Sequence, residues 1–140
     1  MARTEPVATL VDSNVLLDIL VNDPRWFAWS YSATEAARDQ GPLIINPLIY
    51  AEVSAGFATA EEIDGLLDPS EIFREQIPWS AAFLAGKAHL RYRRSGGTRT
   101  NTLPDFFIGA HAAVTGLRLL TRDPRRYRTY FPTLEILAPS

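Results

Sequence analysis

The chain has 140 residues, 46% hydrophobic and 21% charged, a composition typical of a soluble globular protein and sufficient for the core of one domain spanning residues 1–140. It contains no cysteine, which excludes disulfide bonds and thiolate zinc sites. The net charge is −2, but residues 1–75 carry 13 acidic and 4 basic side chains, whereas residues 76–140 carry 3 acidic and 10 basic ones. The chain begins without a signal-peptide pattern, and its apolar runs are too short to cross a bilayer, so we expect a cytoplasmic protein with no membrane contact.

Apolar runs and helical patterns alternate along the first part of the chain, with turn signals between them. Gly41 and the proline after it end one helical pattern, Asn46 followed by proline marks a helix start, and Thr59 opens a capping box. In chain order the predicted elements are a strand at 7–11, helices at 13–20 and 26–40, a strand at 43–45, helices at 47–57 and 59–68, and a strand at 72–77.

The second part of the chain continues the same alternation. A long amphipathic helix is followed by a flexible turn at 95–98, and a second, strongly apolar helix ends at Gly116. The predicted elements are helices at 79–94 and 104–115, and strands at 117–120 and 134–137. Because strands alternate with helices throughout, we predict an α/β fold with a mainly parallel sheet.

Four acidic residues stand in unusually apolar surroundings. Asp12 directly follows the first predicted strand, and Glu52 lies in an apolar helix after the second. Asp105 begins an apolar helix, and Asp123 lies just past the strand at 117–120. Strand carboxyl ends and helix N-termini share one edge of a parallel sheet, so the four carboxylates are predicted to converge there. One or two Mg²⁺ or Mn²⁺ ions would relieve their repulsion, polarise a phosphodiester and activate a bound water.

Each of these acids also has an ordinary local explanation. Asp12 could cap the helix that follows it, and Glu52 could lie on an exposed helix face. Asp105 could be favoured by the helix dipole, and Asp123 could be a turn residue before proline. We favour the common site because all four local explanations would otherwise have to hold together.

Four segments, in this order and spacing, resemble the PIN-domain family: ATLVDSNVLLDIL, PLIYAEV, LPDFFIGAHA and LLTRDPRRYRTYFP. More narrowly they resemble the VapC-type toxins, the ribonuclease half of a type II toxin–antitoxin pair, and the resemblance covers about residues 10–137. It implies an α/β/α sandwich around the parallel sheet and a Mg²⁺- or Mn²⁺-dependent endoribonuclease. It also implies a cognate VapB-type antitoxin that covers the site, and a toxin homodimer.

The resemblance assigns each acid a catalytic and metal-binding position. Asp12, Glu52 and Asp105 match the first, second and third acids of the family. Asp123 matches the fourth position, where family members have Asp or Asn. The supporting polar positions, which would orient ligands or water, fall on Asn14 and Thr121.

Arginines make up thirteen of the fourteen basic residues, and arginine is the residue best suited to two-pronged contact with phosphate. They cluster before and after the helix at 104–115, which favours an anionic polymer as partner, with solvated helix faces as the alternative. The arginines predicted to contact RNA are Arg91, Arg93, Arg94, Arg99, Arg122, Arg125 and Arg126.

Four further polar residues are interpreted as structural. Asp18 lies six residues beyond Asp12, about 240° around a helix, and is expected at the surface or against a partner. His111 is expected to be packed or at the surface, His89 on a solvated helix face, and Tyr127 in a packed position.

The aromatic residues leave two interpretations open. Trp26, Phe27, Trp29 and Tyr31 form a dense patch that could be core or could be an antitoxin or dimer surface. Tyr92 stands among arginines and could stack on a single-stranded base.

The function predicted from these features is hydrolysis of RNA phosphodiester bonds by a metal-activated water, in a toxin controlled by its antitoxin. The alternative is a PIN-like module that binds RNA or protein without cutting. A phosphatase of the haloacid dehalogenase kind is excluded, because those enzymes need a second Asp two residues after the first and this chain has Asn14 there.

Overall fold

The computed structural model describes residues 5–99 and 102–140, and within them the predicted alternation forms one five-stranded sheet. Every pair of neighbouring strands is parallel, in the spatial order β3-β2-β1-β4-β5. The strands are β1 (Thr9–Val11), β2 (Leu43–Ile45), β3 (Ile72–Arg74), β4 (Arg118–Leu120) and β5 (Ile136–Leu137).

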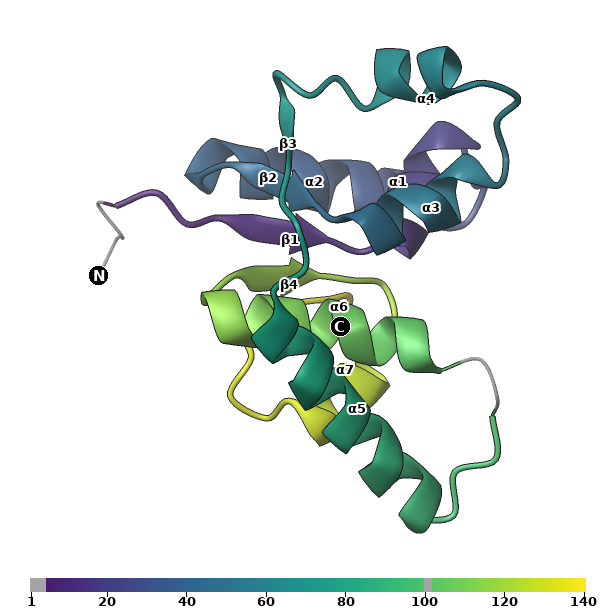
Figure 1. The fold of residues 1–140 in the computed structure, drawn as a ribbon. Helices are drawn as coiled ribbons and strands as arrows, with labels where there is room; N and C mark the ends of the chain where they lie inside the picture. The colour runs from purple at the N-terminus through teal and green to yellow at the C-terminus, as the bar shows by residue number, and fades with distance from the viewer. Residues whose placement is uncertain (1–4, 100–101) are drawn as a thin grey trace.

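Helices cover both faces of the sheet. The chain moves from β1 through β2 to β3 in one direction and from β4 to β5 in the other, so right-handed crossovers place the two sets of helices on opposite faces. Figure 1 shows α1 to α4 on one side of the strands and α5 to α7 on the other, which confirms the predicted three-layer α/β/α sandwich. The helices are α1 (Ser13–Leu20), α2 (Phe27–Gln40), α3 (Pro47–Ser54), α4 (Ala60–Leu66), α5 (Trp79–Arg94), α6 (Leu103–Thr115) and α7 (Arg125–Tyr130).

The central strands are buried on both faces. Leu10 and Val11 in β1, and Leu119 and Leu120 in β4, have no exposed surface. A strand covered on both faces needs no polar side, which explains why neighbouring residues in these strands are both apolar and do not alternate with polar ones. Within the described residues no helix is long and apolar enough to span a bilayer.

The predicted helix starts carry the expected caps. The Asn46 side chain accepts a hydrogen bond from the Ile49 N–H at 2.9 Å and begins α3, and the Thr59 hydroxyl accepts from the Glu62 N–H at 3.2 Å and begins α4. Asp12 is the N-cap of α1, so its predicted local role is present in the structure. Gly116 ends α6 in the left-handed region, at φ 69°.

The structure differs from the sequence interpretation in the ends of several elements and in one additional helix. The helix at 47–57 ends at Ser54, and the strand at 72–77 contains only Ile72–Arg74. Helix α7 was not predicted: it has six residues, of which only Tyr127 is buried, and so short a segment has no helical period to recognise.

The reversal of strand order between β1 and β4 sets the position of the site. Val11 pairs with Leu120 across the two strands, so the residues that follow them, Asp12 and Thr121, come out side by side. The Asp12 N–H still donates to the Leu120 carbonyl, at 2.9 Å. In parallel sheets, ligands bind at the carboxyl ends of strands where the order reverses, and Asp12 lies at that point.

Gly41 lies just before β2 and packs against the backbone of Val7, just before β1, so a substitution here tests how tightly these two segments are packed. A Cβ at this position would lie 2.3 Å from the Val7 carbonyl oxygen and 2.6 Å from the Val7 nitrogen, and neither backbone atom can move aside alone. We expect Gly41→Ala to lower the free energy of unfolding by about 2–3 kcal/mol through overpacking, measured by urea denaturation. The control is Gly86→Ala in α5, where nothing lies within 4 Å of the added Cβ and helix propensity should raise stability by about 0.5–1 kcal/mol. A tolerated Gly41→Ala would contradict the packing described.

Candidate active site at the carboxyl edge of the sheet

Asp12 lies at the base of the site, with 4% of its surface exposed. Its Oδ1 accepts a hydrogen bond from the Ser13 N–H at 2.8 Å. Its Oδ2 accepts from the hydroxyls of Thr121, at 2.8 Å, and Tyr127, at 3.0 Å. Both oxygens are therefore held by donors from three parts of the fold, the start of α1, the end of β4 and helix α7.

The surroundings of Asp12 disfavour its charge. Burial raises the pKa of Asp12 from 3.8 to about 6, against the opposing effect of the Thr121 and Tyr127 hydroxyls. The negative charges of Asp105 and Glu52 raise this pKa further. A carboxylate that is buried and repelled by two others is poised to accept a cation or a proton.

Glu52 is joined to Asp12 through Ser13. The Ser13 hydroxyl donates to Glu52 Oε1 at 3.0 Å and lies 3.5 Å from Asp12 Oδ1. Burial raises the pKa of Glu52, and the charge of Asp105 raises it further. Helices α1 and α3 thus bring two of the predicted acids to the same place.

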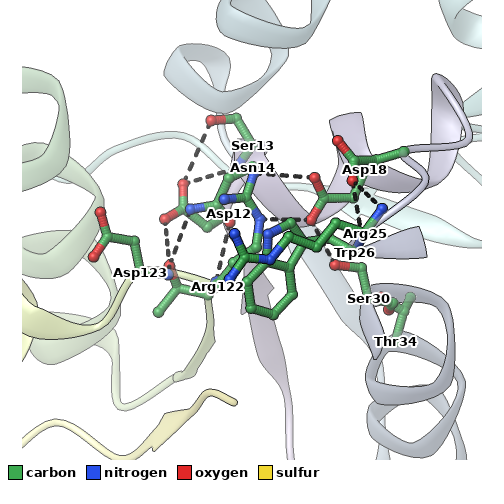
Figure 2. A network of polar contacts seen from close by, with 12 residues as sticks. Asp12, Ser13, Asn14, Asp18, Arg25, Trp26, Ser30, Thr34, Arg122 and Asp123 are labelled. Carbon is green, nitrogen blue, oxygen red and sulfur yellow. Dashed lines mark hydrogen bonds and ion pairs between the residues drawn. The ribbon is translucent and has the colours of Figure 1, made fainter. Parts of the chain in front are cut away.

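Asp105 lies in the first turn of α6 and faces the same edge from the opposite layer. Burial raises its pKa, while the guanidinium of Arg126 opposes this by charge and by hydrogen bonding, with Arg126 Nη1 2.5 Å from Asp105 Oδ2. Asp123 adds its negative charge to the surroundings of Asp105. Asp123 itself is exposed, and its backbone N–H donates to the Thr121 hydroxyl oxygen at 3.1 Å. Figure 2 shows Asp123 beside the network around Asp12.

The donor set suits a hard divalent cation in charge and chemistry. Asp12, Glu52 and Asp105 offer only oxygen ligands, and the charge of Asp105 raises the pKa of the other two. Mg²⁺ and Mn²⁺ prefer oxygen ligands of this kind. Among the described residues, no three acidic or histidine side chains are gathered closely enough to hold a metal ion in this arrangement. Arg126 is the cation that Asp105 contacts here.

A cleft of about 370 Å³ opens beside Asp105 and Asp123. Three of the arginines predicted to contact RNA, Arg99, Arg125 and Arg126, line it. The other lining residues are Tyr92, Thr129 and Tyr130. The cleft therefore places positive side chains directly next to two of the predicted acids.

The remaining predicted arginines lie in different settings. Arg93 and Arg94 are exposed at the end of α5, and Arg91 lies over the Tyr130 ring, 5.4 Å from its centre. Arg122 forms a two-pronged ion pair with Asp18, through Nε at 2.8 Å and Nη2 at 3.0 Å. Its guanidinium is thereby bound by Asp18, and Arg122 does not line the cleft.

The expectation that Asp18 lies at the surface is wrong. The helical angle correctly separates it from Asp12, but Asp18 is only 3% exposed, because α2 and the segment after β4 cover that side of α1. It accepts hydrogen bonds from Arg122 and from the Ser30 hydroxyl, the latter at 2.7 Å. A partner from a distant part of the chain is not visible in the periodicity of one helix.

The packed interpretations of His111 and Tyr127 are confirmed, since both are buried. His111 contacts Asn46 through Nδ1 at 3.0 Å and Glu75 through Nε2 at 2.9 Å. His89 is partly buried against Phe106, so it does not lie on a solvated face as expected.

The aromatic patch is partly packed and partly exposed. Trp29 packs against the core, and Trp26 meets it edge-on at 6.4 Å between ring centres. Phe27 stacks on Tyr31 at 5.6 Å, and Tyr31 is 48% exposed. For Tyr92 base stacking was one open interpretation, and in the structure the guanidinium of Arg126 lies over its ring, 5.5 Å from the ring centre.

Sequence reasoning missed three contributors to the site: Ser13 as the link between Asp12 and Glu52, the hydroxyl of Tyr127, and the pairing of Arg126 with Asp105. The position of Ser13 could have been recognised in the sequence. It directly follows the acid at the end of the first strand, so its hydroxyl lies in the first turn of the next helix and close to that acid. The other two residues belong to α7, which has no recognisable pattern of its own.

Comparisons with known proteins bear on the family and the fold of the chain. The sequence model of the PIN domain matches residues 9–132. A similar fold occurs in VapBC2 from Rickettsia felis bound to a promoter DNA fragment (TM-score 0.73, 17% identity, covering 96% of this chain and 100% of that one). DNA-bound VapBC from Salmonella typhimurium also has a similar fold (TM-score 0.68, 19% identity, covering 94% of this chain and 98% of that one). A toxin–antitoxin complex from Klebsiella pneumoniae is also similar in fold (TM-score 0.64, 23% identity, covering 94% of this chain and 98% of that one). No curated protein sequence matches the chain.

Removing the charge of Asp12 should stabilise the metal-free protein. Its pKa of about 6 in the folded chain exceeds 3.8, so stability falls as the pH rises from about 4 to about 6, and the ionised form costs about 3 kcal/mol above that range. Because the amide replaces one acceptor oxygen by a donor, we expect Asp12→Asn to gain only about 1–2 kcal/mol near pH 7.5 without divalent cations, and nothing near pH 3.5. Thermal unfolding at both pH values measures this, with the exposed Asp39→Asn as control. A loss of stability near pH 7.5 would refute the electrostatic cost assigned to Asp12.

Proposed function

We propose that this chain, which belongs to the PIN-domain family, is a metal-dependent endoribonuclease and the toxin of a VapBC-type toxin–antitoxin pair. The observation that carries the proposal is the nearness of Asp12, Glu52 and Asp105 at the carboxyl edge of the sheet, where the charge of Asp105 raises the pKa of both other acids and the charge of Glu52 raises that of Asp12. Three separate elements deliver these carboxylates, and an arginine-lined cleft adjoins them. Buried mutual repulsion of this kind is a cost to the fold that a ligand-binding role explains.

The carboxylates would act by holding Mg²⁺ or Mn²⁺, one ion or two. Asp12, Glu52 and Asp105 would be the ligands, with Asp123 as the fourth acid at the rim. When bound, the metal supplies Lewis-acid activation of the phosphodiester and a more acidic attacking water.

The side chains around the acids have positioning roles. Thr121 and Tyr127 hold Oδ2 of Asp12, and Ser13 sets the separation of Asp12 from Glu52. These donors fix the carboxylate orientation before any ligand arrives, which is how surrounding hydrogen bonds tune a metal site. Asn14 extends the support by contacting Thr121 at 3.4 Å.

The RNA backbone would lie along the cleft. Arg99 and Arg125 are exposed there, and neither guanidinium has a carboxylate partner among the ion pairs of the described residues. The charge of Arg99 also acts on Asp105, and both guanidinium groups are placed to contact phosphate. An RNA substrate is consistent with a cytoplasmic location.

A second candidate function is binding of RNA or protein without cleavage. Two observations favour it. Asp105 contacts Arg126, and among the described residues no three acidic or histidine side chains are close enough together to hold a metal ion. The two functions differ in whether divalent cations bind and whether RNA is cut.

The partners proposed are a VapB-type antitoxin and a second copy of the chain. The support is that similar folds were crystallised as VapBC and other toxin–antitoxin complexes. Co-expression with a short neighbouring reading frame that relieves toxicity would be the direct test of the antitoxin.

The cleavage test uses protein purified without antitoxin, single-stranded RNA and Mg²⁺. We expect cleavage that stops with chelator and that falls by at least about a hundredfold in Asp12→Asn and in Asp105→Asn, because each removes a ligand charge. Asp39→Asn, an exposed acid outside the site, is the matched control. RNA that is bound but never cut by the wild type would favour the second candidate function.

The salt dependence of RNA binding tests the cleft. For single strands, the logarithm of the binding constant falls with the logarithm of salt concentration by about 0.7 for each phosphate contact. Arg99→Ala and Arg125→Ala should each reduce this slope by about 0.7, whereas Arg38→Ala on α2, which contacts Glu35 and Glu71, should leave it unchanged. Equal slopes in all the variants would remove the cleft from the RNA path.

A further inference from the structure

Asp18 is a buried carboxylate that the proposed reaction does not use. It lies on α1, and its two oxygens are occupied by the guanidinium of Arg122 and the hydroxyl of Ser30. The Trp26 ring lies 5.3 Å from the same guanidinium and closes it off on one side. The ion pair therefore joins α1, α2 and the segment after β4 (Figure 2).

The segment Thr121–Asp123 is attached to α1 at three points. The Thr121 hydroxyl donates to Asp12, the Arg122 N–H donates to the Asn14 side-chain oxygen at 3.2 Å, and the Arg122 guanidinium pairs with Asp18. Asn14 and Asp18 are four residues apart and so lie on one face of the helix. One helix face thus holds the backbone and the side chain of Arg122 together.

These attachments determine where two site residues stand. Thr121 precedes Arg122 and Asp123 follows it. Because both the backbone and the guanidinium of Arg122 are bound to α1, the two neighbouring residues are held in place as well. The Asp123 N–H also donates to Thr121, which couples the two residues directly. Release of Arg122 would loosen the support of Asp12 and the placement of Asp123 at once.

The energetics also point to positioning. Asp18 is buried and the Arg122 side chain is 30% exposed. A largely buried ion pair commonly contributes no more to stability than apolar residues of similar volume, because removal of the charges from water offsets their attraction. What such a pair adds is a defined geometry, since its two-pronged bonds form in one arrangement only.

We propose that Asp18 and Arg122 are positioning residues for the metal site, which act by fixing the segment Thr121–Asp123 against α1. This inference rests on the proposed function, in which the acids bind a divalent cation. In this proposal Arg122 does not contact RNA, although the sequence pattern predicted that it does. It supports the metal site by binding Asp18.

The test replaces the whole buried network by apolar residues in the triple variant Asp18→Leu, Ser30→Ala and Arg122→Met, so that no buried charge or hydroxyl is left unpaired. Mn²⁺ binding to the RNA-free protein is measured by calorimetry, together with the Tm. We expect a Tm close to that of the wild type and Mn²⁺ binding about tenfold weaker, the effect typical of residues that orient metal ligands. Arg38→Met is the control for loss of an arginine.

A second variant covers the case in which the triple variant does not fold. Arg122→Lys keeps the charge but loses the two-pronged contact, and Mn²⁺ binding should weaken several-fold without unfolding. Mn²⁺ affinity equal to that of the wild type in the folded variants overturns the proposal, as does a wild type that binds no Mn²⁺. A wild type that binds Mn²⁺, loses affinity in these variants and yet cuts no RNA would uphold the positioning role and refute the nuclease.

Discussion

The parallel pairing of β1 with β4 is the contact on which the site depends. These two strands are far apart in sequence, and the chain reverses its direction across the sheet where they meet. Because Val11 pairs with Leu120, the next residues of both strands leave the sheet together and Asp12 meets Thr121. Glu52 in α3 and Asp105 in the first turn of α6 come to the same edge, since helix N-termini lie at the carboxyl edge of a parallel sheet.

The cost of this arrangement is electrostatic and is met by local hydrogen bonds. Asp12 is buried beside two like charges, and hydroxyls from Thr121 and Tyr127 only partly offset the effect. The surrounding core supplies rigidity: β1 and β4 are covered on both faces, so the carboxylate cannot retreat towards solvent. A site built in this way keeps its acids close together at the expense of stability, which is the usual direction of exchange between activity and stability.

The sequence was sufficient to predict the strands, most of the helices and the edge at which the acids meet, because those features follow from local patterns. Asp12 and Asp105 could be placed because a strand end and a helix start are visible in the sequence. The partner of Asp18 could not, because Arg122 is more than a hundred residues away and only the fold brings them together. The same is true of Arg126, which reaches Asp105 from a helix too short to have a period.

The uneven charge of the chain finds its explanation in this topology. The acidic part of the sequence contributes Asp12 and Glu52, and the basic part contributes Arg99, Arg125 and Arg126. The sheet order places the layer α1–α4 from the first part opposite the layer α5–α7 from the second. At the carboxyl edge, the charge of Asp105 from the second layer acts on Asp12 and Glu52 from the first. Arg126 already neutralises part of the charge of Asp105. A divalent cation at the acids would therefore compete with Arg126 for Asp105, and an RNA phosphate in the cleft would give the released guanidinium an alternative partner, so that cation and RNA would favour each other's binding.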